Sequence, residues 1–305
     1  LLDHGSPEFR FNLLLMSEGY QEMELATYQA DAQELMAGLL NEAPFDAIDV
    51  ESALNIWRVD VSSSQSGADD PPDCEGGTGA VVATYFDAKF CTDGVPRALT
   101  VNNGTAFLVA SSYQEPFQYI LILVNSDKYG GATILPVSAV SRGTPDWVRA
   151  ATHEMGHGAF DLADEYSHVS DCDAVEPDHW QFNGVEPARP NITAVVGLNG
   201  LKWAALVDPS TLVPTTSNPD FTECDSQPSP VPPGTVGEFD GAGTYHSGLY
   251  RPEFDCRMRT YTTNFCAVCR QRIREVLKPF QSFSISPYDT EFSVEPWPAT
   301  LTWTA

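Results

Sequence analysis

The sequence has few basic residues. Its 305 residues include 16 lysines and arginines against 42 aspartates and glutamates, which gives a formal net charge of −26 at pH 7. Phosphate backbones and anionic bilayers repel such a chain, so we expect neither nucleic acid nor a membrane surface as a partner. The charge fits a soluble secreted protein, for which a solvated acidic surface is the simplest explanation.

The sequence also lacks long apolar runs and internal repeats. The longest runs, at residues 13–16 and 119–124, are the length of strands, so no membrane span is expected. With 42% hydrophobic residues the chain can bury one large core, and we expect a single two-lobed domain and a monomer. Because the first residue is Leu1, we expect either that a signal peptide has been removed or that the chain is a fragment.

Only one Cys-x-x-Cys pair occurs, formed by Cys266 and Cys269. A second pair, which would complete a zinc site, is missing, and no thioredoxin-like βαβ pattern surrounds the first. We therefore expect disulfides and an oxidising compartment, which means secretion or, as alternatives, the periplasm or the cell surface. Proximity in the sequence pairs Cys74 with Cys91, Cys172 with Cys224, and Cys256 with either Cys266 or Cys269, and leaves one of the seven cysteines over.

Strand and helix patterns alternate in the first half of the chain. They predict an α/β (α+β) fold, in which a mostly parallel sheet is flanked by helices. The second half is irregular and rich in Pro, Gly and Asn until a helix-like stretch at residues 265–280. The predicted strands are residues 11–16, 53–61 and 118–125, and the predicted helices are residues 22–40 and 106–113.

Residues 62–79 read as an exposed loop rich in Ser, Asp, Pro and Gly. Carboxylates are the ligands that calcium prefers, so this loop is a candidate calcium site, with a plain solvated loop as the alternative. The acids concerned are Asp69, Asp70, Asp73 and Glu75.

Two histidines four residues apart, His153 and His157, enclose a glutamate, Glu154. On a helix this spacing places both imidazoles on one face, about one turn apart, where both can reach a single zinc ion. Zinc lowers the pKa of a bound water toward about 7, and a carboxylate beside it can take the proton and pass it on. The pattern predicts a metallohydrolase.

The residues before the motif predict its helix. Thr144 is a capping residue, Pro145 fits the first helical position, and Asp146 suits the positive end of the helix dipole. Val148, Ala151 and Met155 then recur with helical spacing and form a core face, which leaves the histidines on another face. The alternative is a helix whose polar face carries two histidines by chance.

Catalytic zinc usually has three protein ligands, so one more is needed. A straight helix would carry Asp164 about 16 Å along the axis from His153, too far to share its metal. We therefore predict that the helix ends at Gly158, which would let the acidic segment fold back toward the histidines. The candidate ligands are Asp161, Asp164, Glu165 and His168.

The stretch from His153 to Tyr166, with Leu-Ala-Asp-Glu-Tyr after the histidines, resembles the IgA-peptidase-type zinc metallopeptidases of bacteria. This resemblance covers most of residues 10–280 and implies a metzincin-like fold. Its upper lobe would be residues 1–157 with the active-site helix, its lower lobe residues 158–280, and residues 281–305 a β-like tail or the start of an appended module. The matching segments include residues 17–20, 55–59, 125–131, 250–252, 256–259 and 265–269.

The resemblance also implies roles for single residues. Ala163 holds the position of the third metzincin ligand and cannot bind metal, so Asp164, one residue later, is assigned instead, with the other candidates kept as rivals. Met258 would form the hydrophobic floor beneath the zinc, as a methionine turn does in metzincins, although a methionine is also a common core filler. Apart from the resemblance, the lower-lobe residues Tyr245, His246 and Tyr250 could each donate a hydrogen bond to a developing oxyanion, and we prefer Tyr245. The alternative for each is packing or surface exposure.

Residues 132–140 are predicted to form an edge strand, because Pro136 cannot donate to a ladder. An extended protein or peptide substrate could add along the edge from Gly131 to Val140, unless Pro136 serves to protect it. The function predicted is a secreted zinc endopeptidase that uses a zinc-bound water, with Glu154 as general base and then acid. The alternatives are a zinc-dependent amidase acting on a non-protein substrate and an extracellular binding module with a purely structural zinc.

Overall fold

The fold is built around a five-stranded sheet with strand order β2-β1-β3-β5-β4. The computed structural model describes residues 1–113, 116–167, 181–218 and 228–281. Strands β2, β1, β3 and β5 run parallel, and β4 is antiparallel to β5 at the edge. This confirms the predicted α/β fold with a mostly parallel sheet. The strands are β1 (Phe11–Glu18), β2 (Leu54–Val59), β3 (Tyr119–Val124), β4 (Gly131–Ile134) and β5 (Val137–Ser141).

Helices cover both faces of the sheet, so its central strands are buried along their whole length. Because side chains alternate across a strand, Leu13 and Leu15 pack into one core with α1 (Leu25–Leu40) and α4 (Trp147–Phe160). Leu14 and Met16 pack into a second core with α3 (Asn103–Tyr113). The continuous apolar runs in the sequence are the consequence of this double burial.

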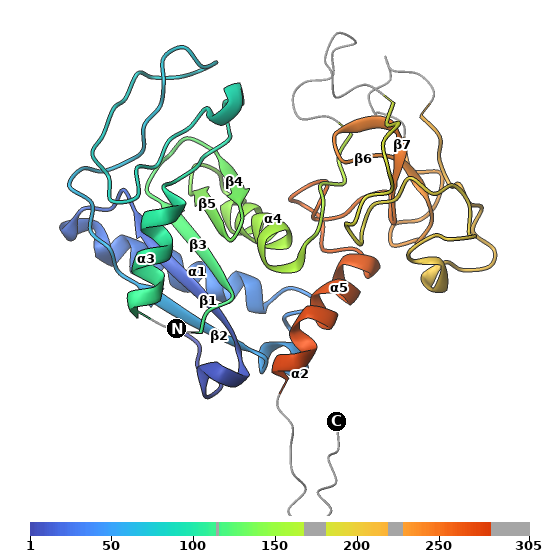
Figure 1. The fold of residues 1–305 in the computed structure, drawn as a ribbon, viewed down its shortest axis with the longest axis horizontal. Helices are drawn as coiled ribbons and strands as arrows, with labels where there is room; N and C mark the ends of the chain where they lie inside the picture. Colours follow the sequence, from blue (N-terminus) through green and yellow to red (C-terminus); the bar gives the residue numbers. More distant parts are fainter. Residues whose placement is uncertain (114–115, 168–180, 219–227, 282–305) are drawn as a thin grey trace, which may run out of the picture.

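The described residues after α4 are mostly irregular and lie beside the sheet region (Figure 1). It contains the antiparallel hairpin β6 (Phe239–Ala242) and β7 (Tyr245–Arg251), followed by α5 (Ala267–Leu277), whose buried residues join the core beneath α4. The remaining short elements are α2 (Ile48–Glu51) and the 3₁₀ turns η1 (Pro7–Phe9), η2 (Glu22–Glu24), η3 (Thr92–Gly94), η5 (Ala204–Leu206) and η6 (Lys278–Phe280). The predicted tail falls almost entirely outside the described residues.

Three expectations about local structure are wrong. Residues 132–140 form two strands, and Pro136 lies in the turn between β4 and β5. Helix α4 begins at Trp147 with Asp146 at its N-cap, so neither Thr144 nor Pro145 takes its predicted position. The helix does not end at Gly158 but continues to Phe160, and Asp161 takes the left-handed conformation (φ 60°) at its C-cap. Gly158 serves packing, because a Cβ there would lie 2.2 Å from the ring of Tyr119.

The cysteine predictions have three outcomes. Cys74 and Cys91 form the predicted disulfide. The predicted bond from Cys256 to Cys266 or Cys269 is wrong, since all three are free buried thiols. Cys172 and Cys224 lie outside the described residues.

The acids of the 62–79 loop do not gather into one site. Asp70 pairs with Lys128, and Asp69 accepts a hydrogen bond from the Val82 amide. Among the described residues, no group of three potential metal ligands comes from this loop. The loop is partly buried, at Ala68, Asp70 and Cys74, and the calcium site stays a prediction.

Candidate active site

Helix α4 carries the two histidines and the glutamate on a part of its surface that faces a cleft. His153 and Glu154 are buried, and His157 is partly exposed. The Nε2 atoms of His153 and His157 lie 3.1 Å apart. The two imidazoles, one helical turn apart, therefore point toward a single position, as binding of one shared ion requires.

Backbone carbonyls orient both imidazoles. Nδ1 of His153 lies 2.9 Å from the carbonyl oxygen of Arg257, and Nδ1 of His157 lies 2.8 Å from that of Leu162. A carbonyl oxygen only accepts, so each Nδ1 carries the proton and donates it. In the neutral rings this leaves the lone pair on Nε2, the atom that faces the other histidine.

Asp164 completes the cluster. Its Oδ1 lies 3.2 Å from Nε2 of His153 and 3.1 Å from Nε2 of His157. The chain reaches this position because it reverses at Asp161, where the Leu162 amide donates to the carbonyl of Gly156 (3.0 Å). The reversal predicted from the sequence exists, but three residues later than expected.

The three facing atoms suit a zinc ion. Tetrahedral zinc with ligands about 2.0 to 2.1 Å away separates neighbouring ligand atoms by about 3.3 Å. The separations of 3.1, 3.1 and 3.2 Å among the two nitrogens and the Asp164 oxygen are close to that value. Two neutral imidazoles and one carboxylate are also a donor set that catalytic zinc sites use. His153, His157 and Asp164 can therefore hold a metal and leave one position open.

Charge in the cluster favours a cation. Burial tends to lower the pKa of His157, but the neighbouring Asp164 carboxylate outweighs it and raises that pKa to about 9. Burial tends to raise the pKa of Asp164, yet the two histidines hold it well below its usual range. The carboxylate is therefore ionised at neutral pH and attracts positive charge to the point where the two Nε2 atoms meet.

Glu154 is held against the edge strand. Its Oε2 accepts a hydrogen bond from the Thr133 hydroxyl of β4 (2.7 Å). The hydroxyls of Thr133 and Ser138 lie 2.5 Å apart, and the Tyr119 hydroxyl donates to Ser138. A Cβ on Gly131 would lie only 3.2 Å from Oε1 of Glu154, so the glycine leaves room for the carboxylate. Edge strand and helix together fix the carboxylate beside the histidines.

A cleft of about 640 Å³ opens over these groups. Arg97 and Tyr166 line it together with the metal cluster, and the Arg97 guanidinium lies 3.5 Å from the Tyr166 hydroxyl. Both side chains can donate to an oxygen that gains negative charge. The sequence analysis missed Arg97, because residues 92–100 carry no motif, and quoted Tyr166 without giving it a role. The lining residues are Val95, Arg97, Ala98, Gly131, Ala132, Thr133, Ile134, Leu135, His153, Glu154, His157, Asp164, Tyr166 and Arg189.

Met258 lies beneath the histidine helix. A Cβ on Gly156 would come within 2.5 Å of its sulfur, so helix and methionine are in close contact, and Met258 is fully buried. Its carbonyl accepts from the Glu165 amide (2.7 Å), and its neighbour Arg257 supplies the carbonyl that orients His153. Met258 therefore packs directly against the histidine helix, and its role as the floor of a zinc site stays a prediction.

The other predicted site residues lie elsewhere. Tyr245 is not among the residues that line the cleft, and its ring packs edge-on against Phe182. Asp161 is half exposed and pairs with Arg189. Glu165 turns away from the histidines toward the free cysteines. His246 and Tyr250 belong to β7 and do not line the cleft, and His168 lies outside the described residues.

Comparison with known families decides the relationship. A family model described as IgA Peptidase M64 matches residues 1–229 and 224–277. The chain belongs to the IgA peptidase M64 family. Membership makes it a peptidase, and the match spans the elements that build the cleft, from β1 to α5. No curated protein matches the chain significantly.

The M64 relationship confirms the resemblance drawn from residues 153–166. A peptidase binds a protein or peptide, which agrees with a cleft bordered by the edge strand β4. None of the helices in the described ranges combines the length and the apolar character needed to cross a bilayer. The Cys74–Cys91 disulfide is typical of proteins from oxidising compartments.

Proposed function

We propose that this M64 peptidase is a secreted zinc endopeptidase in which His153, His157 and Asp164 hold the metal and Glu154 is the general base. The observation that supports it most strongly is the convergence of two Nε2 atoms and one carboxylate oxygen within 3.2 Å, beside Glu154 in a cleft. Secretion is supported by the Cys74–Cys91 disulfide.

A bound zinc would supply a Lewis acid that polarises the scissile carbonyl and acidifies water. Glu154 would take a proton from the attacking water and deliver it to the leaving amine. Its hydrogen bond from Thr133 keeps the carboxylate in place between the two transfers. Arg97 and Tyr166 would donate to the oxygen of the tetrahedral intermediate, the role that the sequence analysis gave to Tyr245.

Strand β4 would bind the substrate. It is the edge of the sheet and contributes Gly131 to Ile134 to the lining of the cleft. An extended peptide pairing with an edge strand presents its backbone at regular intervals and its side chains alternately to pockets. No feature of the cleft lining specifies immunoglobulin A, so we propose no substrate narrower than a protein segment that can become extended.

Replacing Glu154 with glutamine tests the mechanism. The amide keeps the shape of the side chain but cannot accept the proton, so kcat on denatured casein should fall by about 10² to 10⁴-fold while zinc content stays unchanged. Asp146→Asn is the matched control, because Asp146 is on the same helix, half exposed and outside the cleft lining. It should keep both activity and zinc. Equal activity of Glu154→Gln and the parent would refute the catalytic role.

A panel of peptides and acylated non-protein amides separates the proposal from its rivals. An endopeptidase should cut peptides internally, at sites that mass spectrometry maps, and should ignore small amides. A zinc amidase would show the reverse preference. A binding module with structural zinc would cut neither substrate, and its Glu154→Gln variant would behave as the parent does.

A further inference from the structure

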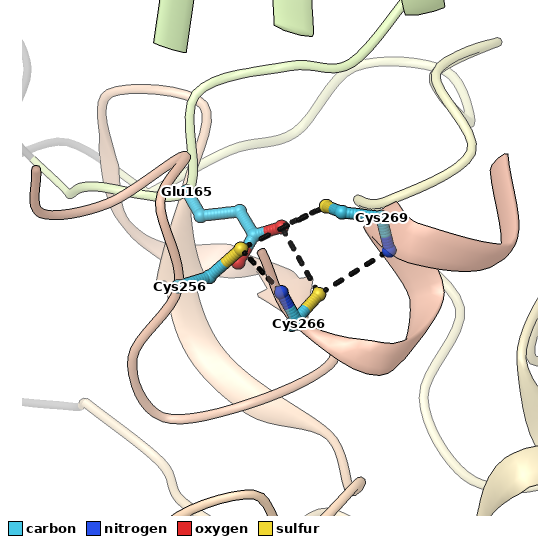
Figure 2. Close-up of side chains that lie close together, drawn as sticks. All are labelled: Glu165, Cys256, Cys266 and Cys269. Atoms are coloured by element: carbon cyan, nitrogen blue, oxygen red, sulfur yellow. Dashed lines mark hydrogen bonds between the residues drawn. The ribbon is translucent and has the colours of Figure 1, made fainter. Parts of the chain in front are cut away.

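Three free cysteines and one glutamate meet outside the cleft, where the end of the acidic segment approaches α5 (Figure 2). Glu165, Cys256, Cys266 and Cys269 are all buried, and their ligand atoms lie within 4.8 Å of one another. They come from two parts of the chain: Glu165 follows α4, and the three cysteines lie between residues 256 and 269. None is needed for the proposed peptidase chemistry.

Three separations within the cluster lie close to the edges of a zinc tetrahedron. Zinc–sulfur bonds of about 2.3 Å put two ligand sulfurs about 3.8 Å apart, and a carboxylate oxygen about 3.5 Å from each sulfur. The sulfurs of Cys256 and Cys269 are 3.8 Å apart. Oε1 of Glu165 lies 3.2 Å from the sulfur of Cys269 and 3.9 Å from that of Cys266.

The backbone is arranged for thiolates. Cys266 is the N-cap of α5, and its sulfur accepts the Cys269 amide at 3.4 Å. The sulfur of Cys256 accepts the Cys266 amide at 3.2 Å. Amide donors and the positive end of a helix dipole both favour the deprotonated sulfur, which is the form that binds metal.

Neither a disulfide nor an ordinary core explains the cluster. A disulfide needs sulfurs about 2.0 Å apart, and Cys256 and Cys269 are much farther apart than that. Burying a carboxylate among thiols is costly unless hydrogen bonds or a cation compensate it, and the Asn191 amide supplies one hydrogen bond, to Oε1 (2.8 Å). Oε2 of Glu165 is buried and has no hydrogen-bond partner among the described residues.

We propose that Glu165, Cys256, Cys266 and Cys269 form a second zinc site, which is structural. Four protein ligands fill a tetrahedron and leave no position for water or substrate, and the burial of all four excludes both. The thiol-rich donor set selects zinc over magnesium or calcium, which prefer oxygen ligands. A bound zinc also keeps these thiols reduced in a protein that carries a disulfide elsewhere.

The site fixes parts of the active site by chain continuity. Glu165 is next to Asp164, so a zinc that holds Glu165 also limits the movement of the adjacent carboxylate. Cys256 is next to Arg257, whose carbonyl orients His153, and two residues before Met258 beneath α4. The second zinc would therefore restrict the movement of the backbone segments that position the ligands of the histidine site.

Metal analysis of the histidine variants tests the proposal without relying on activity. The parent should hold about two equivalents of zinc, and the His153→Ala/His157→Ala double variant about one. Loaded with cobalt(II) in place of zinc, that double variant should show strong near-ultraviolet charge-transfer absorption from sulfur to metal. A double variant that binds neither zinc nor cobalt, or binds cobalt without this absorption, would overturn the proposal.

Cysteine variants give the complementary result. In the His153→Ala/His157→Ala variant, a further Cys266→Ser substitution should abolish binding of the one remaining equivalent of zinc. Glu165→Ala in the same variant should weaken the binding of that zinc. Replacing Cys74 and Cys91 with alanine is the matched control and should leave the parent at about two equivalents, since neither lies in the cluster.

Peptide mapping without reduction is an independent check that does not depend on any variant folding. A disulfide that joins any two of Cys256, Cys266 and Cys269 in the freshly isolated parent would overturn the second site. The peptidase proposal would be unaffected by that result. Conversely, if the histidine variants still bind two equivalents of zinc, the histidine site is refuted as a zinc site, whereas the proposed cysteine site is unaffected.

Discussion

Gly156→Ala is the sharpest test of how the floor of the site works. Gly156 lies inside the histidine motif, and an added Cβ would come within 2.5 Å of the sulfur of Met258, 3.2 Å of its Cε and 3.5 Å of Leu162. Cβ contacts below 3.0 Å essentially never occur, so the methionine must move. Met258 is fully buried, so its side chain has no open space to enter.

Two effects on stability oppose each other. Overpacking a core by one methyl group costs about 1–3 kcal/mol, and alanine in a helix interior gains about 1 kcal/mol over glycine. The free energy of unfolding should therefore fall by about 0–2 kcal/mol. The larger effect should be on zinc, because a shift of Met258 carries with it the Arg257 carbonyl that orients His153. Disturbing the hydrogen-bond partner that orients a metal-binding histidine costs about 10- to 100-fold in metal affinity.

The measurement is peptidase activity as a function of free zinc in a chelator buffer, with urea unfolding beside it. Gly104→Ala in α3 is the control, since Gly104 is exposed and a Cβ there makes only an ordinary 3.4 Å contact. It should gain stability and leave zinc binding unchanged. Met258→Ala in the Gly156→Ala background should recover part of the lost zinc affinity by making room for the methyl group.

The reasoning fails if Gly156→Ala is stabilised as much as Gly104→Ala and binds zinc as the parent does. That outcome would mean that Met258 adapts freely and that no contact between helix and methionine supports the site. Loss of zinc affinity without any rescue by Met258→Ala would also count against the proposed steric cause.

Three further predictions concern separate parts of the chain. Asp164→Ala should release the histidine-bound zinc, and an unchanged zinc content after dialysis would remove its ligand role. Replacing Cys74 and Cys91, 17 residues apart, with alanine should lower the free energy of unfolding by about 3 kcal/mol in urea titrations, and a loss below about 1 kcal/mol would contradict this. Asp70→Asn should cost about 1–3 kcal/mol near neutral pH by breaking the pair with Lys128. Although burial opposes it, hydrogen bonding led by Lys128 lowers the pKa of Asp70, so this stabilisation exists above the usual Asp pKa. It is lost as pH falls through the lowered pKa, and parent and variant should therefore converge in acid.

Local features of the site could be predicted from the sequence. The four-residue spacing of His153 and His157 needs only one helical turn to become a shared site, and the distances confirm that both rings converge. The helix geometry predicted that the chain must reverse after the histidines, and the family resemblance placed Asp164 first among the four candidate ligands. The residue at which the chain turns could not be predicted, since Asp161 adopts a φ of 60°, a conformation that is uncommon for residues other than glycine.

The groups that support the site could not be predicted, because they depend on long-range packing. Thr133 reaches Glu154 from another element, and Arg97 comes from an irregular segment that carries no motif. The cysteine prediction failed for a different reason. Proximity in the sequence favoured disulfides, and no local pattern shows that Glu165 and Cys256 lie beside the Cys266–Cys269 pair.

The carbonyl of Arg257 that orients His153 lies 104 residues further along the chain. A ribosome that has made the histidine motif has therefore not yet made the group that sets the tautomer of its first histidine, nor the methionine beneath the helix. Until residues 257 and 258 have been made, His153 lacks the acceptor for its Nδ1 proton and α4 lacks the methionine that packs against Gly156. The cluster can therefore take its final geometry only after the C-terminal part of this domain has been synthesised and has folded against the helix.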